Sequence, residues 1–303
     1  MHAFKQTLGL ILLLLASSVS RADSLSIVTT IAPIRAIVSS IVGERGDVSV
    51  LINGSASPHH FALKPSQVRR IQTADLLILV DFGLETFIRR PARMVAKDRV
   101  IQLSRSPQVR WLETREIGVI EASHEQSHGH NHSHSAHEDD LHLWLDPNNA
   151  IAMARYVVSV LSAIDPQGQS IYEANLQVFL DEVTATTDQI EARLGRSSDT
   201  PYVVFHDAFQ YFEKRFGLMT PAVVTLNPEM APSAKVVREI RELLLSSGTR
   251  CVFREPQFSP AILEVLTEGL PVTITELDPL GDGMSYTQML NRMTQGFESC
   301  FNQ

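Results

Sequence analysis

The 303-residue sequence has no excess of basic residues, only two cysteines, and no long apolar run after its N-terminal segment. Its 34 acidic residues outnumber 26 basic ones, and the formal net charge is −8. This balance gives no indication of a nucleic-acid partner, whereas a cation is a compatible ligand. No G-x-S-x-G turn is present, so the usual mark of a serine hydrolase is missing as well.

The N-terminus is typical of an export signal. Lys5 precedes an apolar stretch from Leu8 to Ala16, and small residues flank Arg21 just before Asp23. This stretch is too short to span a bilayer comfortably. We therefore expect residues 1–22 to be a cleaved signal peptide and the mature chain not to span the membrane. An uncleaved anchor is the alternative.

The two cysteines, Cys251 and Cys300, form an even pair in a chain that we expect to be exported, and this favours a disulfide. A soft metal site made of both thiols is the alternative. It is the weaker one, because two cysteines without nearby histidines supply only half of a zinc site.

Short β-branched runs alternate with helical patterns along most of the chain, which predicts βαβ units and parallel sheets. The alternation occurs once before residue 147 and again after residue 200. We expect an α/β protein with two lobes, each a mainly parallel sheet flanked by helices, joined by a long rigid helix. The predicted units are an N-terminal lobe over 23–147, a helical connector over 148–195 and a C-terminal lobe over 196–303.

Histidines are concentrated in one polar stretch, since seven of the eleven lie between positions 124 and 142. Residues 121–140 show no apolar period, so we interpret them as a surface loop. Neutral imidazole binds zinc, copper and nickel, and the cluster favours weak, multi-site metal capture over a merely solvated insertion. The six histidines of this auxiliary set are His124, His128, His130, His132, His134 and His137.

Three other histidines stand where a predicted element begins or ends: His59, His142 and His206. In open α/β sheets, loops at strand ends build the ligand crevice. Each of these residues taken alone is more typical of a structural or surface histidine. A common role therefore needs support from elsewhere in the sequence.

Five segments, found in order along the chain, carry a family resemblance: PHHFALKPS, HLWLDP, FHDAFQYFEKRFGL, CVFREPQF and LDPLG. Together with the acidic His-rich insertion they resemble the periplasmic high-affinity zinc-binding receptors of metal ABC importers, the cluster A-I solute-binding proteins. The resemblance implies a two-lobed fold with one zinc ion in the cleft, and an inner-membrane ABC permease with its ATPase as partners. It also implies a periplasmic location, a disulfide between Cys251 and Cys300 in the C-terminal lobe, and, we expect, a monomer.

The family's ligand positions map onto His59, His142 and His206. Related manganese receptors carry a carboxylate at the third position, so three imidazoles favour Zn²⁺ over manganese. Asp278 in LDPLG matches the family's fourth ligand, although a water could fill this position and the aspartate could simply form a turn before Pro279.

Several neighbours of these ligands are expected to stay outside the first shell. Some relatives carry an acidic residue just before the first histidine. In this chain Pro58 occupies that position, so it offers no carboxylate ligand. His60 follows His59 on an extended segment and is expected to point away from the metal. Asp207 and Glu255 could orient ligands, but we favour ordinary solvated or capping roles for both.

The sequence thus predicts a receptor that captures zinc for import and is not an enzyme. A catalytic zinc hydrolase remains an alternative, because three histidines plus an open position also form the layout of a catalytic zinc. A zinc-storing protein or an adhesin on the same fold is a further alternative.

Overall fold

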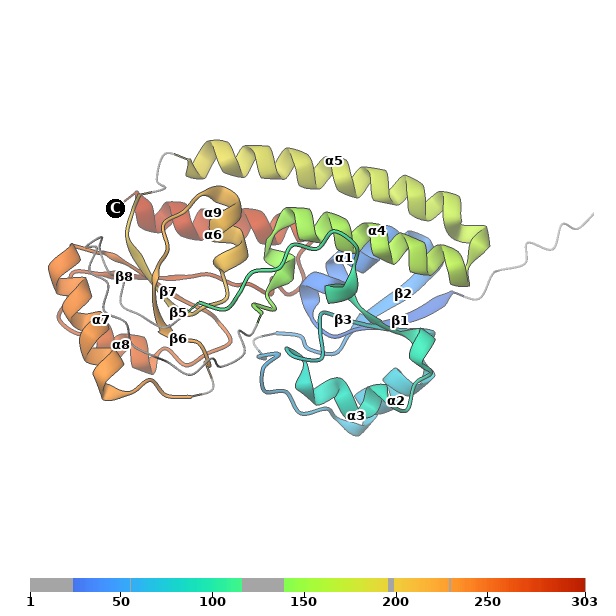
Figure 1. Cartoon of the computed structure of the whole chain (residues 1–303), viewed down its shortest axis with the longest axis horizontal. Coiled ribbons are helices and arrows are strands. Elements are labelled where there is room, and N and C mark those ends of the chain that lie inside the picture. The colour runs from blue at the N-terminus through green and yellow to red at the C-terminus, as the bar shows by residue number, and fades with distance from the viewer. Residues whose placement is uncertain (1–23, 55, 116–138, 196–198, 229, 303) are drawn as a thin grey trace, which may run out of the picture.

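The structure is a computed structural model that describes residues 24–54, 56–115, 139–195, 199–228 and 230–302 (Figure 1). The predicted signal peptide and the auxiliary histidines from His124 to His137 lie outside these residues. Within the described chain, no helix is long and apolar enough to cross a membrane.

The N-terminal lobe is a four-stranded parallel sheet in the order β2-β1-β3-β4. Its inner strands are buried on both faces, and Leu76, Leu77, Ile78 and Leu79 of β3 are at most 1% exposed. Such continuous apolar strands are typical of parallel sheets that helices cover on both sides. The elements are β1 (Leu25–Thr29), α1 (Ala32–Val42), β2 (Gly46–Val50), α2 (Pro65–Thr73), β3 (Leu76–Leu79), α3 (Arg89–Ala92) and β4 (Val100–Gln102).

Two antiparallel helices, α4 (Pro147–Ile164) and α5 (Gln169–Leu194), connect the lobes. Asp146 caps α4, since its Oδ1 accepts a hydrogen bond from the backbone N of Asn148 at 2.9 Å. The 26 residues of α5 span about 39 Å and pack against α1 of one lobe and α9 of the other. The predicted long connecting helix is therefore confirmed.

The connector is tied to the N-terminal lobe at its turn. Asp165 Oδ2 lies 2.5 Å from Arg45 Nη2 and accepts a hydrogen bond from the Tyr172 hydroxyl at 2.6 Å. The turn contains Pro166, which cannot continue α4, and a short 3₁₀ helix delays the start of α5 to Gln169.

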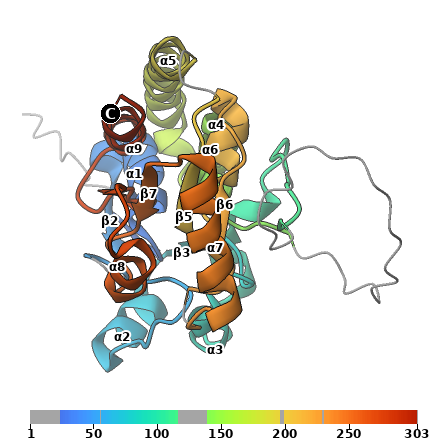
Figure 2. The ribbon, with the colours of Figure 1, turned by 90° about the vertical axis from the view of Figure 1, so that its left-hand side faces the viewer.

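The C-terminal lobe repeats the architecture with the strand order β6-β5-β7-β8, again all parallel. Alternate residues of β5 face different layers. Tyr202 and Val204 join the core shared with α5 and α9, whereas Val203 and Phe205 pack under α7 and α8, the helices nearest the viewer in Figure 2. The elements are β5 (Tyr202–His206), α6 (Gln210–Phe216), β6 (Ala222–Thr225), α7 (Ala234–Ser247), β7 (Cys251–Arg254), α8 (Ala261–Thr267), β8 (Thr273–Glu276) and α9 (Tyr286–Phe301).

The sequence patterns did not predict the shortest elements. β4 has three residues and α3 has four, with Pro91 inside it, so neither is long enough to show a period. The same holds for the 3₁₀ helices, at Gly43–Arg45, Thr86–Ile88, Lys97–Arg99, Leu103–Arg105, Leu143–Leu145 and Pro166–Gly168.

Cys251 and Cys300 form a disulfide that joins β7 to α9, as the sequence analysis expected. Both residues are 2% exposed. Phe253 and Phe297 belong to the same core cluster and pack edge-to-face against each other. The bridge fastens the last helix to the C-terminal sheet.

Reduction of this disulfide is expected to lower the free energy of unfolding of the C-terminal lobe by about 4 kcal/mol, because the bond closes a loop with a sequence separation of 49. Urea unfolding followed by tryptophan fluorescence, with and without reductant, measures the change. A Cys251→Ser/Cys300→Ser variant should match the reduced protein and be insensitive to reductant. An unchanged midpoint after complete reduction would contradict this expectation.

Candidate metal centre

Three imidazoles from separate parts of the chain meet between the lobes. His59 lies in the loop between β2 and α2, His142 precedes α4, and His206 is the last residue of β5. One ring nitrogen from each lies within 4.8 Å of the others. The ring centroids are 5.0 to 5.5 Å apart, which is close enough for a single ion to contact all three.

His142 is held by a carboxylate two residues before it. Asp140 Oδ1 accepts hydrogen bonds from His142 Nδ1 at 2.8 Å and from the His142 backbone N at 3.0 Å. Gln210 Nε2 donates to the other carboxylate oxygen at 3.2 Å. An aspartate at Nδ1 places the ring proton there and leaves the lone pair of Nε2 for a metal.

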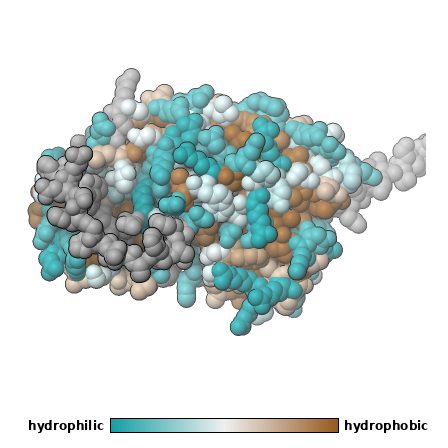
Figure 3. All heavy atoms as spheres, in the orientation of Figure 1, coloured by the Kyte–Doolittle hydropathy of each residue, from teal (hydrophilic) through white to brown (hydrophobic). Residues whose placement is uncertain are grey.

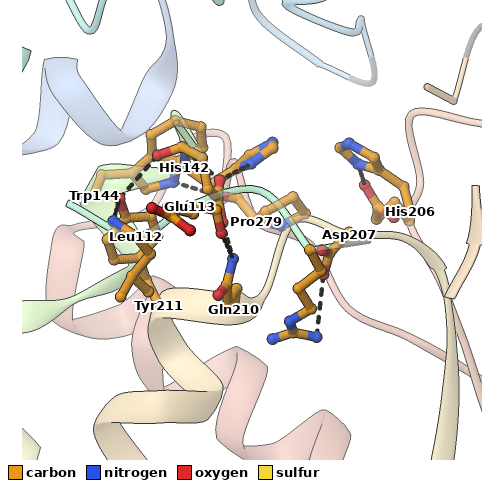
Figure 4. A network of polar contacts seen from close by, with 12 residues as sticks. Leu112, Glu113, His142, Trp144, His206, Asp207, Gln210, Tyr211 and Pro279 are labelled. Atoms are coloured by element: carbon orange, nitrogen blue, oxygen red, sulfur yellow. Dashed lines mark hydrogen bonds and ion pairs between the residues drawn. The ribbon is translucent and has the colours of Figure 1, made fainter. Parts of the chain in front are cut away.

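The chain after His142 is anchored by the C-terminal lobe. Trp144 is fully buried, and its indole N–H donates to the carbonyl of Pro279 at 2.8 Å. The Tyr286 hydroxyl donates in turn to the Trp144 carbonyl at 2.7 Å. Figure 4 shows Trp144 beside Pro279, with His142 and Trp144 on one side of the view and His206 and Asp207 on the other.

His206 is held in a similar way from its own lobe. Its Nδ1 lies 3.1 Å from Glu255 Oε2, and both side chains are buried. Glu255 is therefore not the solvated or capping charge that we favoured from the sequence. The neighbouring Asp207 instead faces Arg115, at 3.2 Å, which also pairs with Glu213.

The electrostatics of the cluster favour neutral imidazoles at two of its three positions. Burial, together with the charge on neighbouring histidines, lowers the pKa of His59 to about 2 and that of His206 well below its usual range. Burial also acts to lower the pKa of His142, but the hydrogen bond and charge of Asp140 outweigh it and leave this pKa raised. His142 is thus the histidine at which a proton competes with a metal.

The space beside the cluster suits a single small ion. The three histidines, Glu255 and Gln257 line a cavity of about 10 Å³ together with Trp144, Phe258, Pro279 and Leu280. A wider hollow of about 430 Å³ is also lined by all three histidines, and by the exposed His60 and Asp139. The smaller cavity has the volume of about one water molecule.

Asp278 is not part of this cluster of ring nitrogens. Its Oδ1 accepts hydrogen bonds from Gln257 Nε2 at 2.8 Å and from the Leu280 backbone N at 3.0 Å, which is the turn role that the sequence also allowed. Its Oδ2 accepts no hydrogen bond from a described residue. Its role as fourth ligand stays a prediction.

Sequence reasoning missed Asp140. The only signal was its spacing, an aspartate two residues before a candidate ligand, and this spacing is common without any contact. The missing information was the hydrogen bond from Gln210 and the packing of Tyr211, whose hydroxyl donates to the Asp140 carbonyl at 2.8 Å.

Two α/β lobes, each built on a parallel sheet, share a long connecting helix and enclose a three-histidine cluster in which His142 and His206 are buried and His59 is partly buried. This arrangement defines a two-lobed solute-binding protein. The chain belongs to the family described as zinc-uptake complex component A, periplasmic, whose model matches residues 27–300. This description is that of a transport component.

Individual relatives agree with this assignment. The chain is 35% identical to the high-affinity zinc uptake system protein ZnuA of Yersinia pestis, over 98% of this chain and 97% of the relative. It is 32% identical to the protein of the same name from Brucella suis, over 91% and 92%. A crystal structure of ZnuA shares the fold, with a TM-score of 0.77 and 22% identity over 92% of this chain and 100% of that one.

Replacement of Asp140 by asparagine is expected to weaken zinc binding about 10- to 100-fold, because the amide no longer fixes the His142 ring as a charged acceptor does. Competition against a chelator measures the affinity. Asp139→Asn is the matched control, since the exposed Asp139 lies one position away and lines the wider hollow, but its carboxylate makes no hydrogen bond or ion pair with a described histidine. If both substitutions weakened zinc binding equally, the loss of affinity would come from the removal of one negative charge near the site and not from the contact between Asp140 and His142.

Zinc affinity is expected to fall as the pH drops through the raised pKa of His142, because the ion must displace its proton. Glu255, whose pKa burial raises to about 8, can release a second proton when the ion's charge stabilises its carboxylate. Calorimetry at pH 7 in buffers of different ionisation enthalpy should therefore count one to two protons released. A count of zero, or of three, would contradict this assignment.

Proposed function

We propose that this protein captures one zinc ion in the periplasm with His59, His142 and His206 and delivers it to an inner-membrane ABC permease with its ATPase. The observation that carries the proposal is the three-imidazole cluster between two lobes in a chain of the zinc-uptake family. Two of the rings are already held by Asp140 and Glu255, so little ordering is needed when the metal enters.

Asp278 is proposed as the fourth ligand. A carboxylate would complete a tetrahedral shell and cancel one of the two charges of the ion. Its Oδ1 remains in the turn with Gln257, and its Oδ2 would approach the metal. A water molecule is the alternative occupant of this position.

A hydrolase is the weaker alternative. The sequence contains one H-E-x-x-H spacing, from His124 to His128, but it stands in a polar run with no apolar helical period, and that motif requires a helix. Among the described residues, the carboxylates that contact the histidine rings, Asp140 and Glu255, bind Nδ1 atoms as orienting groups.

The protein is expected to bind one Zn²⁺ tightly and Mn²⁺ poorly, because manganese prefers oxygen ligands over three imidazoles. Calorimetry with both ions measures the preference. His206→Ala should weaken zinc binding by orders of magnitude, whereas His60→Ala, at an exposed neighbour of His59, should leave it nearly unchanged. Growth under zinc limitation should require this protein and the permease together. Manganese binding as tight as zinc binding would remove the assignment.

The six auxiliary histidines, His124 to His137, are proposed to collect zinc weakly and exchangeably. Each binding event in a polar run must offset about 1–2 kcal/mol of backbone entropy per residue ordered. An antiparallel bridge between Glu113 and Asp139 holds the two ends of the segment together beside His142. Metal released by the segment would thus be close to the cluster.

Deletion of residues 123–138 is expected to lower the zinc stoichiometry but to leave one high-affinity ion. His142→Ala with the segment intact should have the opposite effect, because Leu143, Trp144 and Leu145 fix His142 before metal arrives. Stoichiometry by atomic absorption and affinity by chelator competition separate the two variants. If only the deletion variant lost tight zinc binding, the main zinc site would lie in the polar run and not at His142.

A further inference from the structure

A second large hollow lies in the N-terminal lobe, outside the histidine cluster. It has a volume of about 770 Å³, and its floor includes Phe82, Ala92 and Val95. Four cations from separate short segments surround it, and we call it the basic hollow: Arg89 and Arg93 at α3, Lys97 after it, and Arg105 after β4.

None of these four cations pairs with a carboxylate in the described part of the chain. Arg89 Nε donates to the carbonyl of Phe82 at 2.8 Å, and Arg105 lies 3.1 Å from the amide of Gln102. The carboxylate of Asp81, at the rim, already accepts hydrogen bonds from Ser104 at 2.6 Å and from Gly83 at 2.7 Å. The hollow therefore holds four positive charges against the single carboxylate of Asp81, which makes no ion pair with any of them.

This charge is concentrated in an otherwise acidic protein. Seven of the 26 basic residues stand between positions 89 and 110, where Asp98 is the only acidic residue, although the chain has a net charge of −8. In Figure 3, hydrophilic side chains project from the lower edge of the lobe, where α3 lies in Figure 1, beside hydrophobic surface.

The position of the basic hollow relates it to the metal pocket. Gly83 lines both the basic hollow and the 430 Å³ hollow that leads to the three histidines. Positive charge repels Zn²⁺, so these cations do not serve metal capture. α3 also lies on the side of the molecule away from α5, which leaves this face clear of the connector (Figure 1).

We propose that the basic hollow is a docking surface for an acidic segment of the membrane permease. The proposal rests on the proposed function, which supplies the partner. Guanidinium groups pair bidentately with carboxylates, and the apolar floor can accept the carbon chains of the same segment. A carboxylate-bearing segment seated beside Gly83 would also bring negative charge to the mouth of the metal pocket, which favours movement of zinc toward the partner.

The test is a pair of double charge reversals with the same change in net charge. Arg93→Glu/Lys97→Glu alters two cations of the basic hollow whose side chains make no hydrogen bond or ion pair with a described residue. Lys214→Glu/Arg292→Glu is the control, at exposed positions on α6 and α9. Binding of each zinc-loaded full chain to the permease–ATPase complex is measured in nanodiscs of neutral lipid at several salt concentrations, together with zinc affinity.

The first variant is expected to bind the permease at least about tenfold more weakly, with a reduced salt dependence, and to keep its zinc affinity within about twofold. The control should bind like the wild type. Equal weakening of both variants, or normal docking of the first, would overturn the proposal. So would weakening that appears only when anionic lipid is added, since lipid headgroups would then be the occupant. If the wild type binds zinc but not the permease, the proposed function fails instead.

Discussion

The site depends on the way in which Trp144 joins the two lobes. Its indole is buried at the start of the connector, donates to the Pro279 carbonyl of the C-terminal lobe, and lies 5.4 Å from the His142 ring. Tyr286 at the start of α9 holds the backbone of the same residue. A ligand from the N-terminal side is thereby positioned by atoms of the opposite lobe, so the distance between His142 and His206 depends on how the lobes pack.

The connector makes this arrangement stable. α5 packs along α1 and α9 at once, and the largest core cluster runs without interruption from Ile27 in β1 to Phe297 in α9. A continuous core resists relative movement of the lobes more than a flexible linker would, because any rotation would expose packed side chains. Metal capture can then rely on rings that are already in place, with carboxylates behind two of them. We expect the same carboxylates to link ion binding to proton release.

Acidic and basic side chains gather in different parts of the molecule. The acidic side chains of Asp140 and Glu255 are buried behind imidazoles and hold two of these rings in place, as groups that orient metal ligands do. Basic side chains gather on the outer rim of the N-terminal lobe, where water screens them and a partner can reach them. A uniform surface charge would serve neither task, since zinc and an acidic partner need opposite potentials.

The amino-acid sequence by itself determined the two α/β lobes, the long helix after Pro166 and the pairing of two lone cysteines. Each of these follows from local periodicity, from a residue that cannot continue a helix, or from counting. It also indicated His59, His142 and His206 as candidate metal ligands, because each lies in a short segment that resembles a ligand segment of the family. Only the tertiary structure decided that Asp140 and Glu255 lie behind two of these rings, that Asp278 is engaged in a turn, and that four cations share one hollow. Glu255 reaches His206 across 49 positions of the chain. Asp140 and Asp278 are near their partners in sequence, but their carboxylates are held by Gln210 and Gln257 from other segments. No local pattern encodes such longer-range contacts.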